Sequence, residues 1–358
     1  LRSRGLGDVY KRQGAGYQYE DSVIYGFTHT NKGHWNLCHI PLLPVTGTPT
    51  PGDYCSPFSH ERESAAPGYY QVFLDRYGVD AQLSSTLRCA FHKYTYPAGA
   101  AASLLADLQR SNEHVRAWDI RKEGDNVFAG WQQTGEKMYF YAVANRPVTG
   151  IEPVVERDRE VRIVRFGEGD GALELRIGFS FVSEKNAREN LEAEMLGKSF
   201  AEVRSEATAT WNDLLGRIRV EGGTEREKGL FYSSLYRSFL WPALRSDVNG
   251  EFTDVDGKVI NPGFRYYTGP SYWDDYRNKL ILLGMLAPDV AADVISSDTD
   301  KGEKRGGFMP TFFHGDHASA FVAGTYLRGN RGFDVNRAYN LVLRNATVPV
   351  SYTHLRAH

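Results

Sequence analysis

The chain has 358 residues, of which 41% are hydrophobic and 24% charged, and its formal net charge is −2. These values are ordinary for a globular protein, and the length favours two domains over one. The charge balance offers no basic surface for nucleic acid, and no apolar run reaches the roughly 18 residues of a membrane-spanning helix. Cys38, Cys55 and Cys89 fit neither a zinc cluster nor a disulfide framework, which leaves one disulfide with one free thiol as an open alternative.

The two ends of the chain are related at the level of DNA. One coding sequence for Ser3–Gln13 (SRGLGDVYKRQ) contains, unbroken, the reverse complement of one coding sequence for Val350–His358 (VSYTHLRAH). This inverted repeat resembles the transposase adapter used to prepare sequencing libraries. We therefore expect residues 1–13 and 350–358 to be translated adapter around an insert of Gly14–Pro349, and we assign no function to their glycines and histidines.

From about Tyr69 to Val182 the sequence is typical of short antiparallel strands. β-Branched and aromatic residues alternate with polar ones, and clusters of Gly, Asn, Asp and Pro separate the segments. The segments are YYQVFLD, GVDAQLSSTLR, HVRAWDI, NVFAGWQ, MYFYAVA, EVRIVRF and ALELRIGFSF. We predict an antiparallel β-sandwich domain over residues 14–183.

After Val182 the periodicity becomes helical. The apolar residues of Glu184–Leu215 recur at helical spacing and predict a helical linker over residues 184–223. Thr224 and Glu227 form the pattern of a capping box before a further helix. We expect additional helices over Asp275–Leu286, Pro288–Ser297, His317–Arg328 and Asp334–Asn345. The predicted fold class is therefore multidomain β + α, with the β domain first.

Between these helices, the segment SDVNGEFTDVDGK contains Asn249 and Gly250, which together are a hairpin signal. Its Asp254 and Asp256 suggest a calcium-binding loop. An EF-hand loop needs a glutamate at its last position, and this sequence has Arg265 there. We therefore interpret the two aspartates as turn residues.

The segment YTGPSYWDDYRNKL (Tyr267–Leu280) is rich in aromatic and charged residues. A tryptophan beside an aspartate suits a sugar subsite, because a pyranose has an apolar face and a rim of hydroxyl groups. Trp273, Asp274 and Arg277 are therefore candidate substrate-binding residues. In a structural alternative, Asp274 or Asp275 caps a helix, Arg277 pairs with that carboxylate, and Trp273 lies in the core.

Two further segments are rich in histidine. In MPTFFHGDHASAFVAGTYLRG, His314, Asp316 and His317 precede a helix of small residues, and Asp316 is suited to cap it. A zinc site here lacks a third ligand at a familiar spacing. The segment SVIYGFTHTNKGHWNLCHIPLLP places His34 and Trp35 in a loop of the β domain, from which they could reach the pocket of a neighbouring domain. Each histidine also has an ordinary structural interpretation.

Taken together, these segments resemble glycoside hydrolase family 92, the calcium-dependent exo-acting α-mannosidases. The matching blocks include GYQYEDSVIYGFTHT, FSHERESAAPGYYQVFL, SYWDDYRNKLILL and GDHASAFVAGTYLRGNRGFDVNRAY, in that order. The resemblance implies an N-terminal antiparallel β-sandwich followed by helical linkers and an incomplete (α/α)6 barrel over residues 224–349. It also implies export to the periplasm or the cell exterior, a mannose-containing glycan as partner, and inverting hydrolysis of terminal α-mannosides assisted by Ca²⁺.

The resemblance also suggests roles for individual residues. The family's WDxYR block falls on Trp273, Asp274 and Arg277, which implies contacts of Trp273 and Asp274 with the terminal mannose. Trp35 matches the tryptophan that helps to form the subsite of the leaving sugar. The remaining candidate contacts are His34 and His317.

Two departures from the family pattern bear on catalysis. The Asn-Glu-Thr segment that carries the family's general acid is missing before GDH, so Asp316 is the nearest carboxyl group and the candidate acid. The family's general base and most of its calcium ligands lie beyond the position of Pro349, so we expect this chain alone to be inactive. The alternatives are hydrolysis of a mannose-1-phosphate linkage, whose leaving group needs little protonation, and a carbohydrate-binding or scaffold protein without catalytic groups.

Overall fold

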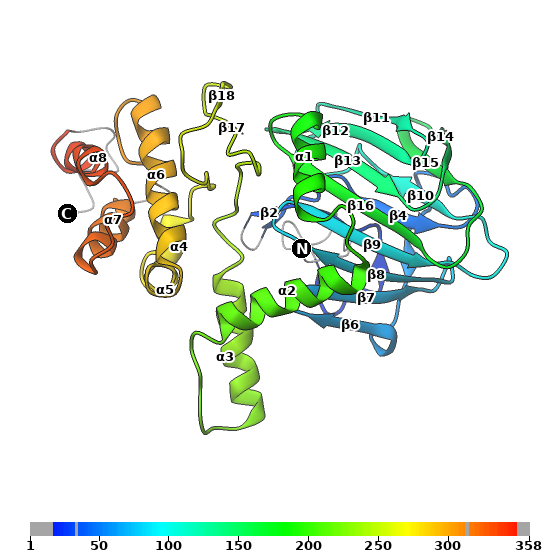
Figure 1. Cartoon of the computed structure of the whole chain (residues 1–358), viewed down its shortest axis with the longest axis horizontal. Helices are drawn as coiled ribbons and strands as arrows, with labels where there is room; N and C mark the ends of the chain where they lie inside the picture. Colours follow the sequence, from blue (N-terminus) through cyan, green and yellow to red (C-terminus); the bar gives the residue numbers. More distant parts are fainter. Residues whose placement is uncertain (1–16, 33–34, 312–314, 349–358) are drawn as a thin grey trace. The chain divides into compact units, whose positions relative to one another are not determined.

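The structure is a computed structural model that describes residues 17–32, 35–311 and 315–348, with the backbone alone for 31–32 and 35–36. The described residues form two compact units. The first is the described part of Leu1–Asn212 together with Asp247–Asn249, and the second is the described part of Asp213–Ser246 and Gly250–His358. Strands dominate the first unit and helices the second (Figure 1). The predicted order, sheets before helices, is confirmed.

The first unit contains an antiparallel sheet with the strand order β11-β12-β13-β16-β9-β8-β7-β6. These strands are β6 (Glu63–Ala66), β7 (Tyr69–Leu74), β8 (Val79–Ser85), β9 (Cys89–Thr95), β11 (Ala117–Gly124), β12 (Val127–Gln133), β13 (Lys137–Ala144) and β16 (Leu173–Ser180). In β13, Met138, Phe140 and Ala142 are buried while the residues between them are half-buried. This period of two is the alternation that predicts the strands from the sequence.

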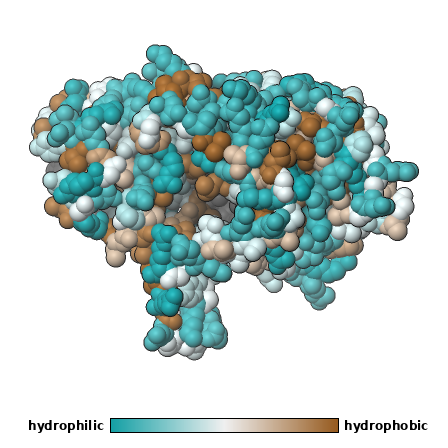
Figure 2. All heavy atoms as spheres, viewed as in Figure 1, coloured by the Kyte–Doolittle hydropathy of each residue, from teal (hydrophilic) through white to brown (hydrophobic). Residues whose placement is uncertain are grey.

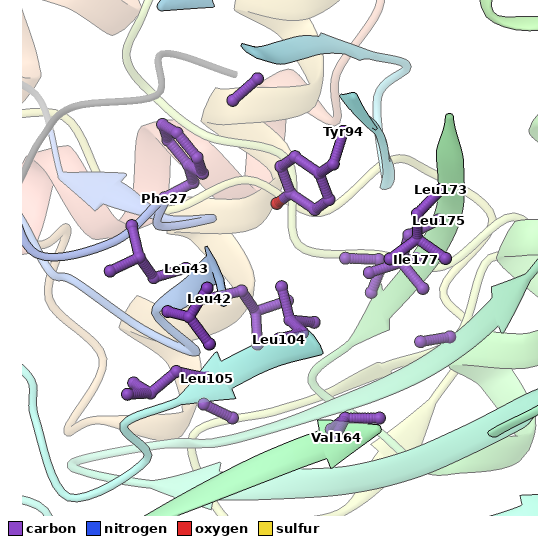
Figure 3. Packing of buried hydrophobic residues seen from close by; sticks show 14 of the residues in the cluster. Phe27, Leu42, Leu43, Tyr94, Leu104, Leu105, Val164, Leu173, Leu175 and Ile177 are labelled. Carbon is purple, nitrogen blue, oxygen red and sulfur yellow. The ribbon is translucent and has the colours of Figure 1, made fainter. Parts of the chain in front are cut away.

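A second antiparallel sheet has the order β14-β15-β10-β4. Its strands are β4 (Leu42–Val45), β10 (Ser103–Ala106), β14 (Val148–Glu156) and β15 (Arg159–Phe166). The two sheets share one hydrophobic core, in which Leu43 and Leu104 of the smaller sheet lie with Tyr94 and Ile177 of the larger one (Figure 3). Every residue of β4 and β10 is buried, so these two strands lack the alternation seen in β13.

Short elements complete the first unit. They are β1 (Val23–Ile24), β2 (Asn31–Lys32), β3 (Trp35–Asn36), β5 (Ser56–Pro57) and the 3₁₀ turn η1 (His60–Arg62). In the second unit, β17 (Phe252–Thr253) and β18 (Val259–Ile260) form a small hairpin.

Helix α1 (Glu184–Glu194) packs on β13 and β16 of the larger sheet (Figure 1). This close approach requires a glycine in β16, because a Cβ at Gly178 would lie 2.0 Å from the carbonyl oxygen of Ala187. The helical stretch predicted after Val182 is broken at Gly197, whose φ is +86°. Helix α2 (Phe200–Leu215) begins after this break, and its first turn joins a second hydrophobic cluster beside the sheet.

The second unit is mainly helical. Its helices are α3 (Glu225–Ser238), α4 (Tyr272–Asp275), α5 (Lys279–Leu286), α6 (Pro288–Lys304), α7 (His317–Leu327) and α8 (Val335–Thr347). Apolar side chains of α5 to α8 form a hydrophobic core separate from that of the sheets. The predicted capping box is confirmed, since the hydroxyl of Thr224 accepts from the backbone N–H of Glu227 and the Glu227 carboxylate accepts in return from the Thr224 N–H.

Two predicted helix boundaries are wrong. The helix expected over Asp275–Leu286 is divided into α4 and α5, because the side-chain oxygen of Asn278 caps a new helix by accepting from the Lys279 N–H at 2.8 Å. Helix α6 continues past Ser297 to Lys304, because acidic and basic residues in its last turns pair along the helix.

The fold also answers two questions that the sequence raises. The carboxylate of Asp254 accepts from the backbone N–H groups of Asp256 and Lys258 at 2.9 and 2.8 Å, and its other oxygen lies 2.9 Å from the Lys304 ammonium. Its interpretation as a turn residue is therefore confirmed. The cysteines Cys38, Cys55 and Cys89 are not joined by a disulfide.

The face seen in Figure 2 is mostly hydrophilic, with hydrophobic residues in small groups. Within the described ranges, no single helix has the length and apolar character needed to cross a membrane. The pair α5 and α6 meets that criterion only together, and the two helices are bent by 120°.

We predict that Gly178→Ala lowers the free energy of unfolding by about 1–3 kcal/mol, because the added methyl group overlaps the backbone of α1. Gly135→Ala is the matched control, since nothing lies within 4 Å of a Cβ at that position. Urea unfolding followed by circular dichroism measures both variants. Equal stability of the two would contradict the close packing of α1 on β16.

Candidate functional site

A buried ion pair fixes the start of α4. Asp298 of α6 is fully buried and accepts a hydrogen bond from the hydroxyl of Tyr272, the first residue of α4. The Lys301 ammonium lies 3.0 Å from the other carboxylate oxygen of Asp298 and 2.9 Å from the Tyr267 carbonyl oxygen. Burial and the charge of Asp298 raise the pKa of the Tyr272 hydroxyl, so this phenol stays protonated and remains a donor. Trp273 follows directly after this anchored residue.

Trp273 and Asp274 point outward from this anchored turn. The Trp273 side chain is 51% exposed, so Trp273 is not a core residue. Asp274 is also exposed and accepts a hydrogen bond from the hydroxyl of Ser271, which itself holds the N-cap position. Asp275 is buried and pairs with Lys279 at 3.0 Å. The core and cap roles of the structural alternative are therefore wrong for these residues.

Arg277 and His317 are brought together by a residue that the sequence analysis does not select. The Nε of Arg277 donates to the hydroxyl of Tyr276 at 2.9 Å, rather than to a carboxylate. The Tyr276 ring stacks on the His317 imidazole, with centroids 4.0 Å apart and planes 7° from parallel. The tyrosine of the WDxYR block is the signal that could have pointed to Tyr276.

Asp316 caps α7, as predicted. Its carboxylate accepts from the Ser319 backbone N–H at 3.4 Å and from the Ser319 hydroxyl. The side-chain amide of Asn345 donates to it at 3.1 Å. Asp316 directly precedes α7, which packs against α4.

The carboxylates around α4 are already engaged with protein groups. Asp275 and Asp298 pair with lysines, and Asp316 caps a helix. Among the residues that the structure describes, no three His, Cys, Asp or Glu side chains cluster in a way that could hold a metal ion. The resemblance places most of the calcium ligands beyond the position of Pro349, so the chemistry derived from the described residues includes no calcium.

The other predicted contacts are His34 and Trp35, and strands β2 and β3 of the first unit form a hairpin around this part of the chain. His34 lies outside the described residues, and only the backbone of Trp35 is described, in β3 paired with β2. Below this tip, Phe27 and Leu42 exchange two backbone hydrogen bonds of 2.8 and 3.1 Å. The base of the hairpin is therefore defined, whereas the contacts of His34 and Trp35 stay predictions.

The returning arm of this hairpin is strained. Cys38 and Ile40 have φ values of 58° and 51°, in the left-handed region that a branched residue rarely adopts. Such a residue costs about 1–3 kcal/mol and persists only where its surroundings hold it. The side-chain oxygen of Gln132 accepts from the Ile40 N–H at 2.8 Å, and the His39 ring lies 3.0 Å from the Thr134 hydroxyl. Gln132 in β12 and Thr134 just after this strand thus stabilise the strained arm.

Two neutral histidines lie beneath the arm. A carbonyl oxygen can only accept, so His29 donates from Nδ1 to the Ile40 oxygen at 2.9 Å. Its Nε2 then accepts from Nε2 of His92 at 3.3 Å, and Nδ1 of His92 accepts from the Tyr94 hydroxyl at 2.7 Å. Burial lowers the pKa of His29 to about 3 and that of His92 well below its usual value.

Comparison with known proteins identifies the family. The sequence model of the glycosyl hydrolase family 92 N-terminal domain matches residues 7–190, and that of the family 92 catalytic domain matches residues 186–357. Together the two matches extend from residue 7 to residue 357. The chain belongs to glycosyl hydrolase family 92.

Solved structures of this family have the same fold. The family GH92 α-mannosidase BT3965 of Bacteroides thetaiotaomicron is 24% identical with a TM-score of 0.88, over 98% of this chain and 54% of its own. The inverting mannosidase BT2199 of the same organism is 23% identical with a TM-score of 0.84, and the match covers 98% of this chain and 51% of BT2199. The gh92 family glycosyl hydrolase ccman5 is 26% identical with a TM-score of 0.83, and the match covers 99% of this chain and 54% of ccman5.

A curated relative is similar over a shorter range. The protein is described as an uncharacterized secreted glycosidase of Arthroderma benhamiae, and it is 24% identical over 290 residues. The match covers 66% of this chain and 37% of the relative. The chain thus spans about half the length of the solved relatives and less than half of the curated one.

We predict that Asp298→Ala lowers the free energy of unfolding by about 3–5 kcal/mol, because the Lys301 ammonium is left largely buried without its carboxylate. Tyr272→Phe removes one charge-assisted hydrogen bond and costs about 1.5–3 kcal/mol. Glu303→Gln is the control on the same helix, since it breaks only the exposed pair with Arg337 and costs about 1 kcal/mol or less. Urea unfolding ranks the variants, and equal stability of Asp298→Ala and Glu303→Gln would contradict the anchoring role.

We predict that the free energy of unfolding falls as the pH drops below about 6.5. Below this pH, His29 and His92 become protonated in the unfolded state but stay neutral in the folded state, so protons favour unfolding. Each histidine contributes about 1.4 kcal/mol per pH unit until its folded pKa is reached. Urea unfolding between about pH 7.5 and 5.5 measures the slope. His92→Gln is expected to reduce this slope, and the exposed control His114→Gln is expected to leave it unchanged. Equal slopes for His92→Gln and the unmodified chain would contradict the assignment of His29 and His92 as a neutral pair.

Proposed function

We propose that the chain is part of a longer glycoside hydrolase that removes terminal α-linked mannose from a glycan with inversion. Family membership supports hydrolysis of a glycoside. The solved relatives include mannosidases, one described as inverting and one in complex with mannoimidazole, which supports mannose as the sugar. The single observation that carries the proposal is the exposed Trp273 beside Asp274 on an anchored turn.

The chemistry of these side chains suits a pyranose. The indole face of Trp273 offers a surface for the C–H face of the sugar, and Asp274 offers acceptors for its hydroxyl groups. Arg277, just after α4, and His317, at the start of α7, supply nitrogen donors. In this proposal, these four residues bind the terminal mannose, and His34 and Trp35 are candidate contacts of the leaving sugar, as the family resemblance implies.

Asp316, the candidate general acid, is engaged as the cap of α7. An inverting glycosidase uses two carboxyl groups about 6.5–9.5 Å apart, with room for the attacking water, and its acid must carry a proton. Asp316 accepts hydrogen bonds from two groups of Ser319 and one of Asn345, so its oxygens are engaged in the cap of α7. We therefore propose that the acid and the base come from residues other than those described around α4.

The family also motivates further parts of the proposal. A requirement for calcium would depend on ligands outside the described residues, because these form no cluster for a metal. Export to the periplasm or the cell exterior is supported by the curated relative that is described as secreted. We propose a β-sandwich over residues 14–183, a linker over 184–223 and the start of an (α/α)6 barrel over 224–349, with adapter residues at 1–13 and 350–358.

We predict that Trp273→Ala and Asp274→Ala each lower kcat/KM of the longer enzyme by about tenfold or more, since each removes a contact to the reacting sugar. Leu230→Ala is the control, because Leu230 is an exposed apolar residue of α3. Release of mannose from α-mannobioses in the presence of calcium measures the rate. Activity near that of the control in both variants would contradict the assigned site.

The same assay separates the alternative functions. Release of mannose from a mannosyl phosphate but not from α-mannobioses would favour hydrolysis of a mannose-1-phosphate linkage. Release from neither substrate, with or without calcium, would contradict the hydrolase proposal. Sugar binding without release would then indicate a carbohydrate-binding or scaffold protein.

A further inference from the structure

Tyr276 contacts two candidate binding residues at once, through two different parts of its side chain. Its ring stacks on the His317 imidazole, and its hydroxyl accepts from Arg277. We propose that Tyr276 is a positioning residue that holds His317 and Arg277 together, so that both direct nitrogen donors at hydroxyl oxygens of one sugar. The identity of the ligand rests on the proposed function, whereas the positioning rests on the geometry.

The His317 imidazole is held by its surroundings rather than by hydrogen bonds. The Tyr276 ring lies 4.0 Å away and nearly parallel, at an angle of 7°. On the chain before it, a Cβ at Gly315 would lie 3.3 Å from both Cε1 and Nε2 of the ring, and φ at Gly315 is +79°. Within the described residues, neither ring nitrogen has a hydrogen-bond partner. The ring is therefore oriented while its nitrogens remain available to a ligand.

Arg277 is held in a similar way. Its Nε donates to the Tyr276 hydroxyl at 2.9 Å, and the guanidinium carbon lies 5.2 Å from the centroid of the same ring. Because the guanidinium is planar, a bond at Nε fixes the plane in which both terminal nitrogens lie. In the part of the chain that the structure describes, these terminal nitrogens bond to no protein group. They form a fork of donors suited to oxygen atoms of a ligand.

The position of Tyr276 in the chain extends this arrangement to Trp273. Tyr276 is the C-cap of α4 and retains helical backbone angles. Residues three positions apart lie on the same side of a helical turn, so Trp273 and Tyr276 share one side of α4. The stacking surface of Trp273 and the donors of Arg277 thus belong to one short segment. The stack on His317 connects this segment to the start of α7.

Nuclear magnetic resonance of the whole chain tests the proposal without requiring activity. Histidine labelled with ¹³C at Cε1 and arginine labelled with ¹⁵N report on the two side chains, and His317→Gln and Arg277→Lys assign their signals. Tyr276→Phe retains the ring and removes the hydroxyl, whereas Tyr276→Leu removes both. Tyr339→Leu is the matched control, since Tyr339 is an exposed tyrosine of α8. Methyl α-mannoside is the ligand probe.

Tyr276→Phe is expected to shift the Arg277 Nε signal and to leave the His317 signal in place. Tyr276→Leu is expected to shift both signals, and the control neither. Affinity for methyl α-mannoside is expected to fall by about threefold in Tyr276→Phe and by about tenfold in Tyr276→Leu.

The outcomes separate the two claims. An unshifted His317 signal in Tyr276→Leu, or an unshifted Arg277 signal in Tyr276→Phe, would overturn the positioning role. The Tyr276→Phe comparison remains decisive even if Tyr276→Leu does not fold. If the signals shift as expected but the unmodified chain does not bind methyl α-mannoside, the positioning role stands and the proposed substrate is wrong.

Discussion

The buried carboxylate of Asp298 is the interaction on which the candidate site depends. A fully buried carboxylate is stable only when its oxygens have partners, and here these are the Tyr272 hydroxyl and the Lys301 ammonium. Helix α4 consists of a single turn, which has little stability of its own. Because Tyr272 begins that turn, the ion pair in α6 fixes the segment that carries Trp273 and Asp274.

In the hairpin of the first unit, buried polar groups likewise hold the backbone in place. Ile40 adopts an unfavourable backbone conformation, and the amide of Gln132 stabilises it. The chain of neutral histidines beneath it has a defined proton on each ring, so every buried nitrogen has a partner. In both units, the segment with candidate contacts is short and irregular. Buried polar groups, rather than regular secondary structure, determine its conformation.

The sequence predicted the features that depend on local pattern. Alternation located β7, β8, β11, β12, β13 and β16 of the larger sheet and β15 of the smaller one, but not β6, β9 or β14. The Thr224–Glu227 spacing located a helix start, and Asp316 was correctly interpreted as a cap. Strands β4 and β10 were missed because both of their faces are buried. The break at Asn278 was missed because a cap inside an apolar run resembles a continuous helix. The partnership of Tyr276 with His317 joins distant parts of the chain, which periodicity cannot indicate.

The central claim is that the sugar binds on α4, against the Trp273 ring. The most direct test is a measurement of intermolecular nuclear Overhauser effects between methyl α-mannoside and the chain with its tryptophan rings labelled. We expect contacts between the C–H protons of the sugar and the indole protons of Trp273. Contacts confined to other tryptophans, with none to Trp273, would contradict it.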